Sequence, residues 1–305
     1  MTGVELESSA LLIDLENLRG FLLVPLHYLE LARNAINGLK EPINLEIISY
    51  SIYPTLTSQQ YIVATSLDDV LIKLLKSFVD RQDTVCTCMR FLSARVAKRI
   101  ESVCRVVDAG TCIEAAAAMR SEDDIEKLKQ LGQTILRCLD RIISTLRVGS
   151  INIGEIITIL VQYLGNSLDL RNTSIDIKPH RIQITVCARL VDGIPLRNCI
   201  GLSIPVLVQI KDFESLIQSL YVRSLSDIPV QILDVATRIF RNINVTSVHV
   251  HGIGIDIHEY PYDIQDLVEA QNLDRITLLI TLYANDIAVL RATTYFYSGK
   301  LYPLW

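Results

Sequence analysis

Residues 122–146 read EDDIEKLKQLGQTILRCLDRIISTL, the longest run in the chain with a single helical period. Apolar residues recur in it at alternating spacings of three and four, which places them on one helix face. Three acidic residues, Glu122–Asp124, open the run and favour the N-terminus of a helix. The apolar seam, interrupted only by Gly132, consists of Ile125, Leu128, Ile135, Leu139, Ile142 and Leu146. Such a seam predicts packing against another helix, from the same chain or from a second copy.

The residues before this helix are predicted to be mainly helical, with one small pair of strands. Leucines at positions 11, 15, 18 and 22 follow a helical spacing and predict a helix over residues 9–23. Ser66, with Asp69 three residues later, predicts the start of a second helix. A further helix is expected over residues 84–106. Residues 43–53 and 60–65 are rich in β-branched and aromatic residues and predict the strand pair.

From residue 150 the pattern changes to short helices that alternate with strands. After an apolar helix over 155–166, apolar residues alternate with mainly polar ones over residues 181–190. Further strands are predicted at 174–178, 199–210, 245–251, 254–259, 275–284 and 287–297. Residues 159–186 and 233–258 share the order helix, strand, strand, which suggests a repeated unit.

These patterns together predict an α+β fold. The first domain, residues 1–149, is expected to be helix-rich with a small strand pair. The second domain, residues 150–305, is expected to hold an antiparallel or mixed sheet built from helix-strand-strand units. One continuous domain is the alternative to this division, because 305 residues is near the upper limit of a single core.

Composition indicates a soluble cytoplasmic protein. No apolar run reaches the roughly 20 residues that a membrane-spanning helix needs, so no membrane partner is expected. The net charge of −5 is mild and spread evenly, which does not favour a nucleic-acid partner. Seven cysteines form no Cys-x-x-Cys pair, and their odd number predicts reduced, buried thiols rather than a disulfide framework.

Three of the five histidines lie within ten residues and suggest a metal site. His249 and His251 are two apart, so on a strand their imidazoles project from the same face. If the chain turns between Gly252 and Gly254, then Asp256 or His258 could join them. That arrangement would give three or four ligands for zinc or another divalent metal, the one cofactor the sequence suggests. In an unbroken strand, Asp256 and His258 would lie on the opposite face, and ordinary strand histidines are then the simpler interpretation.

A basic helix face offers a second candidate site. Arg95, Lys98 and Arg99 share one side of the helix expected over residues 84–106, and cations in a row can contact phosphates. Nearby Glu101 and Asp108 dilute this charge, and no aromatic residues alternate with it to stack on bases.

No complete catalytic motif is present. The sequence lacks a phosphate-binding Gly-x-x-x-x-Gly-Lys loop, a Gly-x-Ser-x-Gly elbow and a His-Glu-x-x-His pair. The leading hypothesis is therefore a non-enzymatic structural or interaction protein that assembles, with a protein partner or as a homo-oligomer, through its apolar helices. The first alternative is a metal-dependent enzyme or metal-binding module that uses His249, His251 and His258. The second is a nucleic-acid-binding protein that uses the basic helix face.

Overall fold

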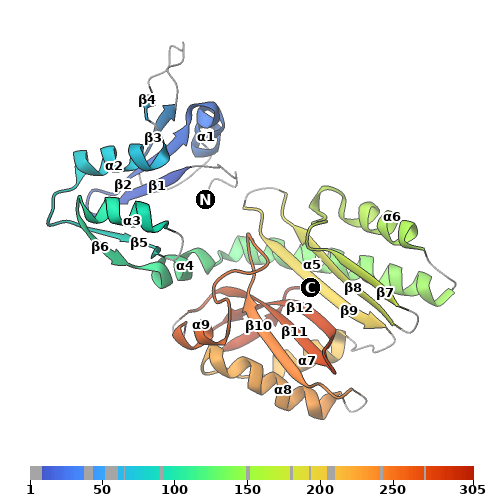
Figure 1. Ribbon diagram of the computed structural model, residues 1–305. Coiled ribbons are helices and arrows are strands. Elements are labelled where there is room, and N and C mark those ends of the chain that lie inside the picture. Colours follow the sequence, from blue (N-terminus) through green and yellow to red (C-terminus); the bar gives the residue numbers. More distant parts are fainter. Residues whose placement is uncertain are drawn as a thin grey trace. The chain divides into compact units, whose positions relative to one another are not determined.

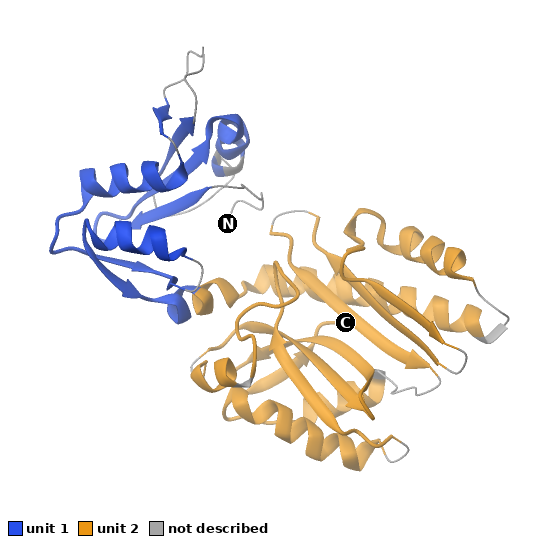
Figure 2. Cartoon of the chain, in the orientation of Figure 1, with its two compact units in different colours: residues 1–113 blue, residues 114–305 orange. Residues whose placement is uncertain are grey.

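The computed structural model describes residues 9–37, 44–51, 61–64, 66–89, 92–148, 152–178, 181–191, 194–204, 210–240, 243–270 and 273–305. The chain folds into two compact units, residues 1–113 and residues 114–305, which Figure 2 distinguishes by colour. We call them unit 1 and unit 2.

Among its described residues, unit 1 contains a four-stranded sheet and a separate pair of strands (Figure 1). The sheet has the order β1-β2-β3-β4; β1 is antiparallel to β2, and the other pairs are parallel. The separate strands, β5 and β6, are parallel. The bounds are β1 Ala10–Asp14, β2 Arg19–Pro25, β3 Asn44–Ser51, β4 Ile62–Val63, β5 Thr84–Thr87 and β6 Arg105–Asp108.

The helices of unit 1 bury both faces of strand β2. Leu74 of α2 lies in one apolar cluster with Leu23, and Ala32 of α1 lies in another with Leu22. Because neighbouring strand residues project to opposite faces, β2 is covered on both sides. The helices are η1 Leu26–Tyr28, α1 Leu29–Asn37, α2 Leu67–Phe78, α3 Ala94–Glu101 and α4 Gly110–Ala118, the last of which continues into unit 2.

The helix expected over residues 9–23 is wrong, because these residues form the β1–β2 hairpin. Asp14 accepts hydrogen bonds from the backbone N–H groups of Glu16 and Asn17, both at 3.1 Å, and from the Asn17 amide at 2.7 Å. These bonds fix a tight turn that ends at Leu18, whose φ is 51°. Four leucines on two short strands mimic a helical spacing, and the turn formed by Asp14 outweighs it.

The helix expected over residues 84–106 is shorter than predicted. Residues 84–87 form β5, and α3 begins only at Ala94, where the Ser93 side chain accepts a hydrogen bond from the Val96 N–H at 3.3 Å. The strands expected at 43–53 and 60–65 are confirmed as β3 and β4. The N-terminal region therefore holds more strand and less helix than its sequence suggested.

In the part of the chain that the structure describes, unit 2 contains one seven-stranded sheet whose pairings are all antiparallel. Six strands follow the order β10-β11-β12-β9-β8-β7, and β13 pairs with β12. The bounds are β7 Ser174–Lys178, β8 Arg181–Arg189, β9 Arg197–Ile204, β10 Ser247–Gly252, β11 Ile276–Ala284, β12 Ile287–Tyr297 and β13 Lys300–Pro303. The expected α+β class and an antiparallel C-terminal sheet are thus confirmed.

The sheet of unit 2 consists of two similar halves. Helix α6 precedes β7, β8 and β9, and helix α8 precedes β10, β11 and β12. The two triplets meet at the β9–β12 pairing, with β7 and β10 farthest from it. The helix-strand-strand unit predicted over residues 159–186 is therefore present, whereas the one predicted over residues 233–258 lacks its second strand, because no strand follows β10 before β11.

Four helices, α5 to α8, cover one face of this sheet and form the largest core (Figure 1). Leu139 of α5, Leu160 of α6, Phe213 of α7 and Ile232 of α8 share this core with sheet residues such as Ile200. The helices are α5 Glu122–Val148, α6 Ile153–Leu164, η3 Gly165–Ser167, α7 Ile210–Ser219, η4 Leu225–Asp227, α8 Ile228–Ile239 and α9 Ile264–Glu269. None of the described helices combines the length and apolar content that crossing a membrane requires.

The apolar seam of α5 belongs to this core. Ile135, Leu139 and Ile142 are at most 1% exposed. A charge introduced at Leu139 would therefore disturb the interior of unit 2 rather than a contact between copies. Helices α5 and α6 pack together, and α5 contacts β8 and β9. The change of sequence pattern at residue 150 thus falls inside unit 2.

Candidate functional site

The face of the unit 2 sheet opposite the core helices carries two rows of side chains, and we call it the histidine face. Directly opposite residues of antiparallel strands project from the same face. The arginine row crosses five strands and consists of His249, Thr281, Arg291, Gly201 and Thr185. The cysteine row lies beside it and consists of His251, Leu279, Thr293, Cys199 and Cys187.

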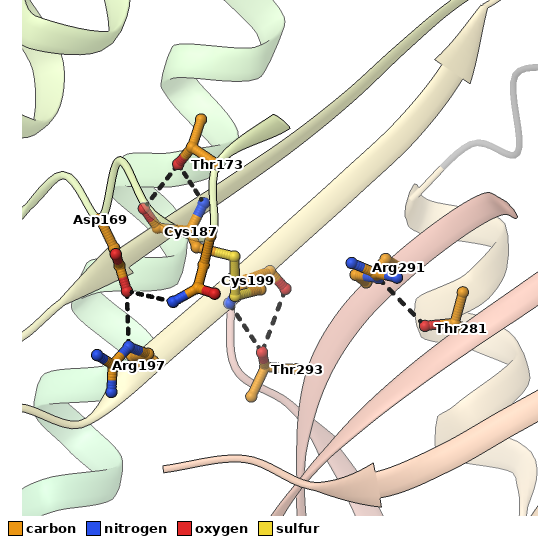
Figure 3. The surroundings of a disulfide bond; sticks show 9 residues. Asp169, Thr173, Cys187, Arg197, Cys199, Thr281, Arg291 and Thr293 are labelled. Atoms are coloured by element: carbon orange, nitrogen blue, oxygen red, sulfur yellow. Dashed lines mark hydrogen bonds and ion pairs between the residues drawn. A yellow bond between two sulfur atoms is a disulfide. The ribbon is translucent and has the colours of Figure 1, made fainter. Parts of the chain in front are cut away.

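A disulfide between Cys187 and Cys199 lies at one end of the cysteine row (Figure 3). The two residues face each other on β8 and β9, with Cα atoms 4.2 Å apart. The expectation of seven reduced thiols is wrong for this pair, whereas the other five cysteines are free. Twelve residues separate the two cysteines in sequence. Only the register of β8 on β9 brings their sulfur atoms together.

Threonines and an ion pair fix the strands around this disulfide (Figure 3). Thr293 Oγ1 accepts from the Cys199 N–H at 2.9 Å, and Thr173 Oγ1 accepts from the Cys187 N–H at 3.1 Å. Asp169 accepts from Arg197 Nε at 2.6 Å. Burial opposes ionisation of Asp169, but hydrogen bonds from Asn172 and Arg197 outweigh it and lower its pKa.

The middle of the cysteine row is apolar. Ile253, Leu279 and the two half-cystines form one buried cluster, with Ile257 packed against it. A disulfide and a leucine offer no anionic ligand to a hard metal cation. The interior of the histidine face therefore differs chemically from its rim, where the imidazoles lie.

Residues 253–259 form a loop where the sequence predicted a strand at 254–259, so that prediction is wrong. The chain turns after β10: the Gly252 N–H donates to the Pro261 carbonyl at 2.6 Å, and the Glu259 N–H donates to the Gly252 carbonyl at 3.0 Å. A Cβ atom on Gly254 would lie 1.9 Å from Arg120 Nη2 and 2.2 Å from Glu259 Oε2. Glycine is required here because this ion pair passes directly beside the backbone.

Arg120 holds the loop of residues 253–259 through an ion pair. Its side chain is 4% exposed and forms an ion pair with Glu259, whose side chain is 19% exposed. The guanidinium also donates to the Ala117 carbonyl at 2.6 Å and to Thr277 Oγ1 at 3.3 Å. Glu259 accepts from the Asp256 N–H at 3.1 Å. Arg120 therefore connects helix α4, strand β11 and the loop of residues 253–259.

The loop brings His258 against His251, with ring centroids 4.2 Å apart. His258 is exposed and His251 half-buried. The Nδ1–H of His251 donates to the Gly252 carbonyl at 2.9 Å, since a carbonyl can only accept. The Nε2 atom of the neutral ring then carries the lone pair.

Burial lowers the pKa of His251 to about 4. The hydrogen bond to Gly252 opposes this shift, whereas the neighbouring His258, Arg291 and His249 add to it. His251 is therefore a neutral imidazole at pH 7, suited to accept a hydrogen bond at Nε2.

This pKa predicts an acid-sensitive unit 2. The unfolded chain binds a proton at His251 near pH 6.5, and the folded chain only near pH 4. Stability is therefore full above pH 6.5 and falls by about 3 kcal/mol as the pH drops to 4. Urea unfolding at pH 7.0 and 4.5, followed by fluorescence of the single tryptophan, Trp305, measures this loss. The variant His251→Gln should lose less stability over that interval, and an equal loss in both proteins would contradict the assignment.

The four residues predicted to hold a metal do not converge. His249 is exposed and lies against Tyr283, with ring centroids 4.7 Å apart. The Asp256 side chain is 83% exposed and 3.9 Å from Arg197. No group of three or more His, Cys, Asp or Glu side chains within the described ranges is arranged to hold a metal ion. His251 and His258 alone come together, which supplies two ligands where zinc sites use three or four.

The basic helix face is largely neutralised by α2. Arg95 forms an ion pair with Asp68 at 2.7 Å, and Arg99 forms one with Asp69 at 2.6 Å. The Arg99 hydrogen bond and charge lower the pKa of Asp69. Lys98 is exposed. These cations chiefly link α3 to α2, which leaves little net charge for a phosphate backbone.

Comparisons with known proteins identify the fold. No protein-family model matches the sequence, and no curated protein matches it. The Xaa-Pro dipeptidase from Bacillus anthracis is structurally similar, with 13% identity and a TM-score of 0.67 over 100% of this chain and 88% of that one. The X-Pro aminopeptidase from Thermotoga maritima MSB8 gives 14% identity and a TM-score of 0.63 over 97% and 87%. The chain shares the pita-bread fold with these two proteins.

The pita-bread fold also occurs in a protein whose description names no peptidase. The N-terminal domain of the FACT complex subunit SPT16 from Cicer arietinum is 16% identical, with a TM-score of 0.61 over 99% of this chain and 84% of that one. Sequence identities of 11–16% among such structures leave only the fold in common.

The pita-bread fold overturns the leading hypothesis from the sequence. A non-enzymatic protein that assembles through its apolar helices was expected, but structures of peptidases share the whole architecture. The apolar seam of α5, which suggested assembly, is part of the core of unit 2. The interaction-protein hypothesis is therefore wrong, and the apolar face of α5 on which it depended is buried within the chain.

Several residues of the histidine face escaped the sequence analysis. Arg120, Arg291 and Glu259 carry no motif, and their partners lie far away in sequence; 139 residues separate Arg120 from Glu259. One signal was available: two glycines follow His251 within three residues, which indicates backbone in close contact with something else.

Proposed function

We propose that unit 2 takes peptides as its ligands and binds them at the rim of the histidine face, next to His251 and His258. The observation that carries this proposal is the pairing of the two imidazoles, 4.2 Å apart, on the sheet face opposite the core helices. A neutral His251 with a free Nε2 accepts a hydrogen bond from a peptide N–H, and the exposed His258 adds a second polar contact.

The fold supports a peptide as the ligand class. Proteins named Xaa-Pro dipeptidase, X-Pro aminopeptidase and prolidase share it over nearly their whole length. The first two names place proline second in the substrate. Peptides beginning Xaa-Pro are therefore the first ligands to test.

A divalent metal does not fit the described residues as they stand. The pair His251–His258 provides nitrogen ligands, but Leu279 and the disulfide occupy the middle of the cysteine row. Two imidazoles alone hold a metal weakly. No step of peptide binding is therefore assigned to a metal.

The test is a titration of the full chain with Ala-Pro and with longer Xaa-Pro peptides, followed by calorimetry. We expect saturable binding that His251→Ala and His258→Ala each weaken at least about 10-fold, because each removes one hydrogen bond in a desolvated contact. His27→Ala is the matched control, since His27 is an exposed histidine of unit 1.

Release of free amino acids should be measured in the same samples, with and without added Mn²⁺, Co²⁺ or Zn²⁺. Hydrolysis that depends on an added metal and on both histidines would show that the site completes a metal centre with its ligand bound. Failure of every Xaa-Pro peptide to bind would refute the proposal.

A further inference from the structure

Arg291 is a cation on the histidine face for which the described residues provide no carboxylate within 4 Å. Its Nε–H donates to Thr281 Oγ1 at 3.3 Å, which orients the guanidinium (Figure 3). The other partly buried arginines of unit 2 differ in this respect. Arg120 pairs with Glu259, and Arg197 pairs with Asp169 at 2.6 Å. A partly buried guanidinium without a carboxylate partner is available to bind an anion.

Imidazoles lie on the same part of the face as Arg291: His249 is in the same row, and His251 with His258 lies beside it. Arg291, His258 and His249 all act on His251, and each of them disfavours its protonation. Two acids of the loop have other cationic partners: Glu259 pairs with Arg120, and the Asp256 carboxylate is 83% exposed and 3.9 Å from Arg197. This part of the face therefore holds one permanent cation and three imidazoles.

A second observation comes from Ser203, on the same face of β9 as Gly201. Ser203 is fully buried, and its Oγ atom has no hydrogen-bond partner among the described residues. Leaving a buried hydroxyl without a partner costs about 1–3 kcal/mol. A hydrogen bond from a water molecule or a ligand would recover this energy. Gly201, two residues before Ser203, lies directly opposite Arg291, and Thr185 Oγ1 and Arg291 Cβ occupy the space that a side chain on Gly201 would take.

We propose that Arg291 binds a carboxylate group of the peptide ligand, with the imidazoles of His251 and His258 beside it. This inference rests on the proposed function and specifies the chemistry of its ligand. The planar guanidinium has two further nitrogen donors besides Nε, which match the two oxygen atoms of a carboxylate in a bidentate contact. The carboxylate comes from the peptide C-terminus or from an acidic side chain.

Three versions of one Xaa-Pro peptide separate these sources: a free C-terminus, a C-terminal amide, and an amide that carries a glutamate. We expect the free acid to bind about 10- to 100-fold more tightly than the plain amide. The affinity of the glutamate peptide should equal that of the free acid only if Arg291 binds the carboxylate of a side chain. Equal affinity of all three would overturn the carboxylate site while leaving peptide binding intact.

The variants identify the residue responsible. Arg291→Gln should reduce affinity for the free acid to that for the amide and leave the amide unaffected, a pattern that general loss of structure would not give. Arg291→Lys keeps the positive charge but loses the planar arrangement of donors. This variant should retain part of the preference for the free acid over the amide. Equal weakening of acid and amide by Arg291→Gln would assign Arg291 a structural role only.

Acetate tests the same site without any peptide. In a ¹⁵N-resolved spectrum of the full chain, the Arg291 Nε–H signal should shift and saturate during an acetate titration. The Nε–H signal of Arg95, an exposed arginine already paired with Asp68, is the control and should respond only weakly. An Arg291 signal that does not respond, or responds no more than that of Arg95, would overturn the proposal even if every peptide failed to bind.

Discussion

Replacing Arg120 with methionine is expected to lower the free energy of unfolding of unit 2 by about 3 kcal/mol or more. The change leaves the Glu259 carboxylate largely buried and unpaired, and it removes donors from the Ala117 and Ile253 carbonyls. Removing one partner of a buried pair costs more than the pair itself contributes, because the remaining charge has lost its water. Chemical unfolding followed by Trp305 fluorescence measures the effect.

Two controls show whether the charge or the packing is responsible. The double variant Arg120→Met, Glu259→Gln should recover part of the loss, since no buried charge remains. Arg95→Met breaks an exposed pair in unit 1, where the arginine side chain is 72% exposed, and should cost less than about 1 kcal/mol. An Arg120→Met protein as stable as Arg95→Met would show that the loop is not held by this ion pair.

The same substitution should displace His258. Its loop is fastened to the rest of unit 2 through Glu259, and Glu259 also accepts from the Asp256 N–H. In the Arg120→Met protein, the ring contact between His251 and His258 should weaken, and peptide affinity should fall with it.

Replacing Gly132 with alanine is expected to destabilise unit 2 by about 3 kcal/mol, although alanine is the better helix former. A Cβ atom at this position of α5 would lie 1.7 Å from the Leu304 carbonyl oxygen and 2.7 Å from Asn198 Nδ2. That amide is fully buried and donates to the carbonyls of Leu128 and Leu304, at 2.9 and 2.6 Å. The backbone of the C-terminal segment cannot move away without breaking these bonds.

The matched control is Gln133→Ala, one residue along the same helix and exposed. It should change the free energy of unfolding by less than about 0.5 kcal/mol. Urea unfolding monitored by circular dichroism compares the two variants. Equal stability of the two would mean that the C-terminal segment does not pack on Gly132.

Much of the fold could be predicted from local sequence patterns. The long helix α5 follows from its seam and its acidic first turn, and β8 follows from its alternation of apolar residues. The two errors in unit 1 share one cause. In both places a side chain that bonds to the backbone, Asp14 in the turn and Ser93 at the helix start, determined where the elements begin and end, and local patterns such as the spacing of the four leucines did not.

The candidate site was only partly accessible to sequence reasoning. His249, His251 and His258 are close in sequence, and a turn after Gly252 was recognised as the condition for bringing them together. That turn forms, but it pairs His258 with His251 and leaves Asp256 in solvent. The loop that carries His258 is held by the ion pair of Arg120 with Glu259, and no local pattern connects Arg120 to this loop.

The sequence by itself determined which segments are amphipathic, where the long helix lies and which histidines are near neighbours, because these properties repeat within a few residues. Tertiary structure alone decided that Cys187 meets Cys199, that Leu279 fills the middle of their row and that Arg291 lies beside Thr281. The physical reason is the register of antiparallel strands. A shift of one residue in any pairing would carry these side chains to the opposite face, and that register is fixed by packing against α5 to α8 rather than by local sequence.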